Sequence, residues 1–252
     1  MTALPDGYAL ITLDSIDSTN EEAKRVAATN WLDNGTVTVI RANEQTAGKS
    51  RRGRGWVSQP GNLYCSLLLA PDCPASETPQ YGFVAGIALR EVVAGLLPGE
   101  CVISCKWPND LLVDGRKIAG VLLEGSGVAH QSLDWLVIGV GANIDHHPEG
   151  TEFPATDLKA LGGKGITPEL FLSQFIDAFE RWKRRWQEEG FAAVRQAWLA
   201  VAHGQGMAIT VRLDGSTFSG VFVDLDVDGA LMLDQGHGLL RVTAGDVFFA
   251  AA

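Results

Sequence analysis

The stretch that decides the fold is Lys106-Trp107-Pro108-Asn109-Asp110. It follows the mostly apolar residues 102–105, which predict a strand, and the proline stops that strand because it has no backbone N–H to donate to a sheet. Burying an ammonium is costly unless it is paired, so Lys106 needs an anion nearby. Either Asp110, in a structural ion pair, or the phosphate or carboxylate of a ligand would supply it.

A basic loop upstream is the second candidate site. Residues 48–56 read Gly-Lys-Ser-Arg-Arg-Gly-Arg-Gly-Trp, within a predicted loop from Asn43 to Gly61. Glycine lets a backbone approach a ligand, and arginine offers forked donors that match phosphate or carboxylate oxygens. The beginning of this motif resembles the end of a P-loop, but Asn43 stands where a P-loop requires glycine. The loop is therefore either an anion site of another kind or a solvated basic loop.

Two further motifs are weaker when taken alone. Residues 114–120, Asp-Gly-Arg-Lys-Ile-Ala-Gly, predict a hairpin tip with exposed charges. Residues 139–143, Gly-Val-Gly-Ala-Asn, end a predicted buried strand, where glycines would admit a ring system and Asn143 could read a purine edge. A plain strand-terminating turn is the alternative.

Periodicity around these motifs predicts both strands and helices, as in an α+β fold. Either Ser18 with Glu21 or Thr19 with Glu22 can form a capping box at the start of the first helix. The expected strands are 8–13, 36–41, 62–69, 102–107, 111–113, 117–124 and 135–140, and the expected helices run to about Ala28 and over 81–97, 168–190 and 191–200.

From His203 onward the pattern changes to short strands with Gly or Asp-Gly turns, expected at 208–213, 218–224, 230–233 and 239–242. We therefore expect two domains, residues 1–202 and a small β-barrel of residues 203–252.

Composition limits the possible functions. The chain has 252 residues and a formal net charge of −10, which argues against a nucleic-acid binder. It has no apolar run of the roughly 18 residues that a membrane helix needs, and its N-terminus has no signal-peptide pattern. Its cysteines show no CxxC pair, so we expect free thiols, no metal site and a cytoplasmic location; they are Cys65, Cys73, Cys101 and Cys105.

The order of these motifs resembles the biotin protein ligase family. Asp17-Ser18-Thr19-Asn20, the segment 44–56, Lys106–Asp110, Arg116–Gly120 and Gly139-x-Gly141-x-Asn143 carry the resemblance over about residues 8 to 145. It implies a class II synthetase-like catalytic fold, an α+β fold with a mixed sheet packed with helices, and a small C-terminal SH3-like β-barrel. It also implies a monofunctional form, because the chain begins with the catalytic strand and leaves no room for an N-terminal helix-turn-helix, so no DNA-binding role is expected.

The resemblance implies a role for each matching residue. Lys117 would bind the biotin carboxylate and the α-phosphate together with Arg51, Lys106 would add positive charge, and Asp110 would lie where the acceptor lysine enters. The implied biotin site is Ser18, Thr19, Asn20, Gln45, Gly48, Lys49, Gly120, Gly139 and Gly141. The implied nucleotide site is Arg51, Arg52, Arg54, Trp56, Asn109, Lys117 and Asn143.

The implied function is ATP-dependent formation of biotinyl-5'-AMP, followed by transfer of biotin to a lysine of a biotin carboxyl carrier protein. ATP and Mg²⁺ would be required, no protein metal site is implied, and the chain would be a monomer or a weak homodimer. A lipoate or octanoate ligase of related fold, or a non-catalytic ligand-binding module, is the alternative. The chain lacks the triple glycine and the following histidine that lipoyl-type enzymes carry.

One departure from the family pattern concerns the basic loop. The usual loop reads Gly-Arg-Gly-Arg-Arg-Gly-Arg, whereas Lys49 and Ser50 here replace the first arginine and the second glycine. Lysine keeps the charge without the fork, and serine resists positive φ, so altered loop closure is expected.

Overall fold

The computed structural model describes residues 4–29, 35–126, 132–213 and 215–249. Its larger sheet has the order β1-β2-β3-β7-β6-β5-β4, with β1 and β2 parallel and the other neighbours antiparallel. The expected mixed sheet is thus confirmed. Its strands are β1 (Tyr8–Ile16), β2 (Val37–Gln45), β3 (Leu63–Leu69), β4 (Ile103–Lys106), β5 (Asp110–Val113), β6 (Arg116–Gly125) and β7 (Leu136–Ala142).

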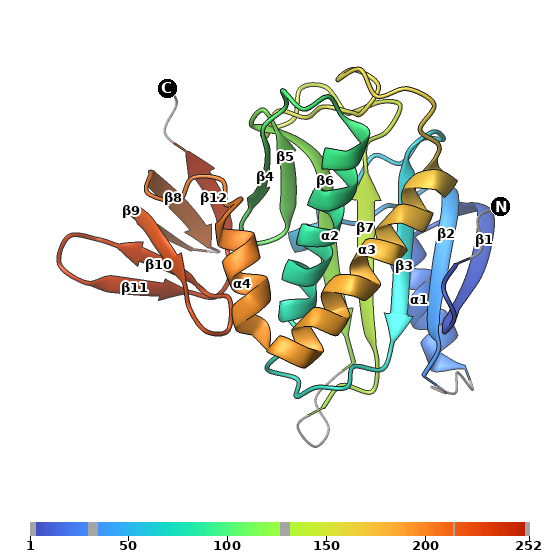
Figure 1. The fold of residues 1–252 in the computed structure, drawn as a ribbon, viewed down its shortest axis with the longest axis horizontal. Helices are drawn as coiled ribbons and strands as arrows, with labels where there is room; N and C mark the ends of the chain where they lie inside the picture. Colours follow the sequence, from blue (N-terminus) through green and yellow to red (C-terminus); the bar gives the residue numbers. More distant parts are fainter. Residues whose placement is uncertain (1–3, 30–34, 127–131, 214, 250–252) are drawn as a thin grey trace.

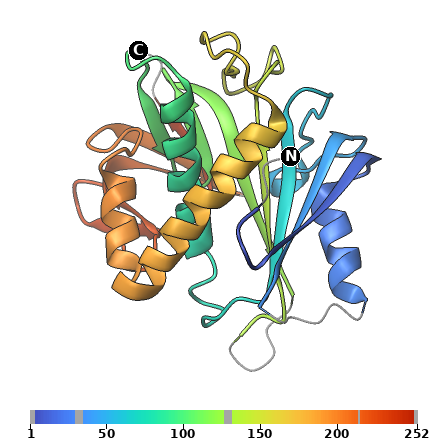
Figure 2. The ribbon, with the colours of Figure 1, turned by 45° about the vertical axis from the view of Figure 1, so that its right-hand side comes forward.

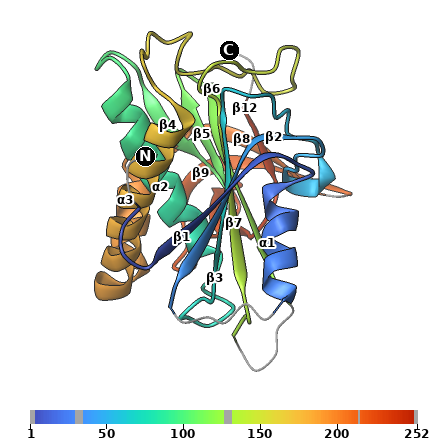
Figure 3. The same ribbon diagram turned by 90° about the vertical axis from the view of Figure 1, so that its right-hand side faces the viewer.

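Helices cover both faces of this sheet (Figure 1). They are α1 (Thr19–Ala28), α2 (Gln80–Leu96), α3 (Pro168–Glu189) and α4 (Phe191–Leu199), with a 3₁₀ turn at Arg51–Gly53. Figure 3 shows α2 and α3 on one face and α1 on the other. None of the described helices is long and apolar enough to cross a membrane.

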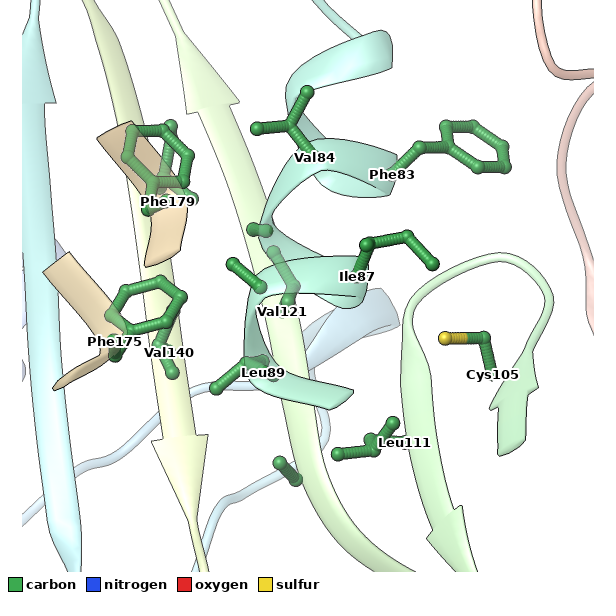
Figure 4. Packing of buried hydrophobic residues seen from close by; sticks show 14 of the residues in the cluster. Phe83, Val84, Ile87, Leu89, Cys105, Leu111, Val121, Val140, Phe175 and Phe179 are labelled. Atoms are coloured by element: carbon green, nitrogen blue, oxygen red, sulfur yellow. The ribbon is translucent and has the colours of Figure 1, made fainter. Parts of the chain in front are cut away.

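The main core lies between the sheet and the pair α2 and α3 (Figure 4). Phe175 and Phe179 lie one helical turn apart on α3 and are fully buried, as residues on the apolar face of an amphipathic helix are. They face residues of α2 such as Val84 and Leu89. On the other face, Ala23 of α1 packs in a smaller cluster against β2, β3 and β7. The sheet is therefore held rigidly from both sides, and this fixes the ends of its strands.

A separate five-stranded antiparallel sheet follows α4, seen beside the β4 edge in Figures 1 and 2. It consists of β8 (Ala208–Leu213), β9 (Ser216–Leu225), β10 (Leu231–Asp234), β11 (Leu239–Val242) and β12 (Asp246–Phe249). This sheet is consistent with the expected SH3-like module. The strand pattern missed β12, whose four residues pair with β8 and are recognised only by that pairing.

The capping-box prediction is wrong. Ser18 is the N-cap of α1, but its side chain makes no capping hydrogen bond. Glu21 instead pairs with Lys24 and Lys49, and Glu22 pairs with Arg25. A carboxylate gains more from a nearby cation than from a neutral N–H, so both glutamates point away from the helix start.

Candidate active site

A small polar pocket of about 40 Å³ lies at the start of α1, over β6 and β7. All of the predicted biotin residues except Gly48 line it. Gly48 lies just behind, where a Cβ atom would come within 2.5 Å of both Ser58 Oγ and the Trp56 carbonyl. The structure therefore brings the predicted biotin site together from four separate stretches of the chain.

A closed set of hydrogen bonds organises this polar pocket. Gln45 Oε1 accepts from the Thr19 backbone N–H at 2.8 Å, and Gln45 Nε2 donates to Ser58 Oγ at 2.9 Å. Ser66 Oγ lies 2.8 Å from Thr19 Oγ1 and 2.6 Å from Asn20 Oδ1, and Ser66 is fully buried. Because these hydrogen bonds hold Thr19, Gln45 and Ser66 in fixed orientations, the pocket is preorganised to read donors and acceptors of a small polar ligand.

The glycines of β6 and β7 allow a close approach, as predicted. A Cβ atom on Gly139 would lie 2.2 Å from Asn20 Oδ1, and one on Gly141 would lie 2.6 Å from the Trp56 ring. Glycine is needed there because side chains of the protein itself rest on the strands. Trp56 thereby separates the polar pocket from a second cavity, since it lines both.

The second cavity, the charged cavity, has a volume of about 270 Å³. Four cationic side chains line it, from three separate stretches of sequence: Arg51, Arg54, Lys106 and Lys117. Arg51 and Lys117 also line the polar pocket, so both stand where the two cavities meet. Cations that converge on a shared cavity are suited to binding an anionic ligand.

Lys117 and Asp110 form an ion pair at the wall of this cavity. Their Nζ and Oδ1 atoms are 2.5 Å apart, and the Lys117 amine lies 5.2 Å from the centroid of the Trp56 ring. The proposed pair between Lys106 and Asp110 is therefore not what forms, although these two residues are opposite each other in the sheet. Asp110 is taken by the lysine on the neighbouring strand.

Lys106 has an aromatic neighbour in place of a carboxylate. It is 6% exposed, and its amine lies 3.7 Å from the centroid of the Phe153 ring, with no ion pair to any described residue. Burial lowers the pKa of Lys106 to about 8, an effect that the negative charge of Asp110 partly offsets. A cation–π contact is weaker than an ion pair in such a place, so this buried ammonium remains available to an anion.

The arginines of the basic loop are held by the C-terminal sheet. Arg54 Nη2 lies 3.1 Å from Asp246 Oδ1, Arg52 Nη1 lies 3.4 Å from Asp246 Oδ2, and Arg51 Nη1 donates to the Gly245 carbonyl at 3.0 Å. Burial lowers the pKa of Arg51. The negative charge of Asp246, and to a smaller extent that of Asp110, opposes this shift. A single carboxylate thus gathers three of the predicted phosphate-binding side chains, although Arg52 itself lines neither cavity.

The two departures in the loop have local consequences. Lys49 reaches back to Glu21, with 2.6 Å between Nζ and Oε1. Ser50 is extended, with φ of −129°, and its N–H donates to the Arg54 carbonyl at 2.7 Å. The positive φ values fall on Arg52 and Gly53 instead. In this conformation serine at position 50 is therefore not strained.

The remaining predicted nucleotide residues are also at the charged cavity. Asn109 accepts weakly from Arg51, at 3.5 Å, and donates to the Val121 carbonyl at 2.6 Å. Asn143 donates from Nδ2 to the Thr156 carbonyl at 2.9 Å and is 3% exposed. These bonds fix the orientation of both amides, so each presents a defined edge to the cavity.

Several residues of the site were missed by sequence reasoning. Ser66 lies inside an apolar strand, Phe153 in an irregular segment and Asp246 in the second sheet. A polar residue in the middle of an apolar strand was a usable signal for Ser66. No sequence signal pairs Asp246 with a loop almost two hundred positions earlier.

Fold and site together define a protein with adjoining pockets for a small polar ligand and an anionic one, bridged by cations. Residues 12–143 match the Biotin/lipoate A/B protein ligase family, and residues 206–250 match the Biotin protein ligase C terminal domain. The chain belongs to this family.

Similar proteins of known name indicate which branch of this family the chain resembles. The biotin--[acetyl-CoA-carboxylase] ligase of Paracoccus denitrificans is 37% identical over 92% of this chain and 97% of its own length. The bifunctional ligase/repressor BirA of Bacillus subtilis is 32% identical over 96% of this chain and 74% of its own length.

Among solved structures, the biotin protein ligase from Aquifex aeolicus in complex with biotin and ATP has a TM-score of 0.79 and 26% identity, and the match covers 95% of this chain and 97% of that one. The biotin protein ligase from Leishmania major in complex with biotinyl-5-AMP has a TM-score of 0.66 and 26% identity, over 93% and 98% of the two chains.

Proposed function

We propose that this chain activates biotin with ATP to biotinyl-5'-AMP and then transfers biotin to a lysine of a biotin carboxyl carrier protein. The observation that carries the proposal is that Arg51 and Lys117 line both the polar pocket and the charged cavity. Two reactants bound in those cavities would meet beside these two cations. The names of the relatives supply the identity of the reactants.

The first step joins two anions. A carboxylate oxygen of biotin attacks the α-phosphorus of ATP, a P–O bond forms, and the bond to pyrophosphate breaks. Lys117 and Arg51 would stabilise the charge that develops on the phosphoryl oxygens, since both line the two cavities. The polar pocket orients the biotin ring system through Thr19 and Gln45.

Mg²⁺ accompanies ATP in this proposal. The described residues contain no group of three or more His, Cys, Asp or Glu side chains that could hold a metal on their own. Carboxylates do line the charged cavity, namely Asp110, Glu152 and Asp246, and Mg²⁺ prefers such oxygens together with substrate phosphates. The fit is therefore to an ion held mainly by ATP and contacted by one of these carboxylates, where it would neutralise phosphate charge.

In the second step the acceptor amine attacks the carbonyl carbon of biotinyl-AMP. Asp110 is positioned to orient the incoming ammonium and accept its proton, since it lines the charged cavity beside Lys117. Asp110→Asn should slow transfer to the carrier protein about tenfold more than it slows pyrophosphate exchange. Equal loss in both assays would assign Asp110 to adenylation or to architecture.

We propose further that the boundary between the catalytic domain and the C-terminal β-barrel lies between residues 202 and 203. Absence of a DNA-binding role and a monomeric or weakly dimeric state stay predictions, for which gel-shift and sedimentation measurements are the tests.

Pyrophosphate exchange measured side by side with biotin, lipoate and octanoate tests the proposed function. We expect exchange that depends on biotin, with lipoate and octanoate at background. Exchange with lipoate or octanoate in preference to biotin would move the chain to the lipoyl branch of the family, and no exchange with any acid would reject the ligase assignment.

A further inference from the structure

A third cavity, of about 310 Å³, opens beside the other two. Its walls come from the start of α2, from β6 and from the turn before β10. The charged cavity, the polar pocket and this cavity share only two lining residues, Arg51 and Asn109. Three cavities therefore meet at one place in the described part of the molecule.

The reaction proposed above needs three reactants at one point. The polar pocket and the charged cavity take the biotin and the nucleotide, which leaves the third cavity for the acceptor. We propose that the third cavity receives the segment of the acceptor protein that flanks its target lysine, with an apolar side chain of that segment buried in it. This inference rests on the proposed function.

The walls of the third cavity suit such a segment. Phe83, Trp107, Pro108 and Leu123 give it an apolar lining. Val227 directly precedes the lining residue Asp228 in the sequence and is 82% exposed. An exposed valine next to an apolar hollow favours contact with another protein, because burying both removes apolar surface from water.

One carboxylate in the lining is compatible with a lysine-bearing segment. Asp228 is part of the lining and pairs with Arg241, and its side chain remains 42% exposed. Asp110, at the wall of the charged cavity, directly follows the turn of residues 107–109, and Trp107 and Pro108 of this turn line both larger cavities. A lysine whose flanking residues bind in the third cavity would extend past these two residues toward the ion pair of Asp110 and Lys117.

The transfer step balances with the groups present. The ammonium gives one proton to Asp110 or to solvent, the free amine nitrogen forms a bond to the carbonyl carbon, and the bond from that carbon to the phosphate oxygen breaks. AMP leaves with the electron pair, and the second amine proton is lost to solvent. The third cavity takes no part in this chemistry and acts only by positioning the segment.

Gly82 on α2 offers a way to fill the third cavity. A Cβ atom there would meet only Leu123, at 3.5 Å, which is ordinary contact, so Gly82→Met projects its side chain into the cavity. Gly95→Met is the matched control, because it lies on the same helix and a Cβ atom there meets nothing within 4 Å. Ser76→Trp, at an exposed position of the same cavity, is a second variant that does not depend on packing inside the helix.

Three assays separate docking from chemistry: pyrophosphate exchange with biotin, release of AMP from bound biotinyl-AMP by hydroxylamine, and transfer to a recombinant biotin carboxyl carrier protein. We expect Gly82→Met and Ser76→Trp to raise the KM for the carrier protein about tenfold or more. Exchange and hydroxylamine release should stay within about twofold of the unmodified chain, and Gly95→Met should match it in all three.

An unchanged KM for the carrier protein in both variants would overturn the docking proposal. So would an equal loss in the hydroxylamine reaction, because a small nucleophile needs no docking surface. Absence of exchange in the unmodified chain would instead contradict the proposed function and leave no acceptor to dock.

Discussion

The polar pocket and the charged cavity adjoin, yet they are built in opposite ways. In the polar pocket, neutral groups are bonded to one another: Thr19 is bonded both to Gln45 and to the fully buried Ser66. In the charged cavity, Lys106 is buried without a carboxylate partner among the described residues, and the two lining arginines, Arg51 and Arg54, pair with Asp246 from the other sheet. The polar pocket is therefore preorganised by its own hydrogen bonds. The charged cavity is lined by more cations than carboxylates, which favours an anionic ligand.

The largest expected effect is at the junction of the two cavities. Lys117→Met should lower biotin-dependent pyrophosphate exchange by about 10²–10³, the usual loss when one charge-stabilising donor is removed. Lys159→Met is the matched control, since Lys159 is 68% exposed and pairs only with Asp145. A folded Lys117→Met protein with near-normal exchange would show that the junction is not where the reactants meet.

A second prediction concerns the unpaired charge of Lys106. Its pKa is about 8 in the folded chain against about 10.4 when unfolded, so between these values the unfolded chain binds more protons and stability rises with pH. Lys106→Met should therefore be more stable at pH 7 by about 1–3 kcal/mol, and the gain should vanish toward pH 10. Unfolding in urea at several pH values measures this, and a pH-independent difference would contradict it.

Removing a polar group from the polar pocket should lower the free energy of unfolding, whereas removing the amine of Lys106 should raise it. Ser66→Ala leaves Asn20 Oδ1 without its buried partner, so the free energy of unfolding should fall by about 1–2 kcal/mol and the KM for biotin should rise. Ser173→Ala is the control, a buried serine on α3 away from both cavities. If Ser66→Ala changes neither the free energy of unfolding nor the KM for biotin, the hydrogen bonds of Ser66 do not preorganise the pocket.

The smallest effect is expected at Asp246. Asp246→Asn removes the carboxylate that holds Arg51, Arg52 and Arg54, and partly exposed ion pairs are individually weak. Tryptic cleavage within the basic loop of the ligand-free protein should therefore become roughly three- to tenfold faster. Asp145→Asn, at the exposed pair with Lys159, should leave the cleavage rate unchanged. A loop no more sensitive than before would show that the C-terminal sheet does not restrain it.

Much of this structure could be predicted from local pattern. The predicted helices, and the predicted strands apart from the missing β12, lie close to their observed places because apolar periodicity and turn residues are local signals. The partner of Lys106 could not be predicted, because Asp110 and a ligand anion are both compatible with the local sequence. The hairpin decides between them by placing Lys117 next to Asp110. The capping box failed for a related reason, because Lys49 competes for Glu21 from another segment.

The sequence by itself determined most strands and helices, the change to short strands near His203, and which side chains carry charge or can approach a ligand. Only the tertiary structure decided which cation is paired, which is left for an anion, and that Asp246 holds the basic loop. The physical reason is range: backbone preferences and amphipathic patterns act over a few residues, whereas an ion pair depends on distance in space, which chain topology alone sets.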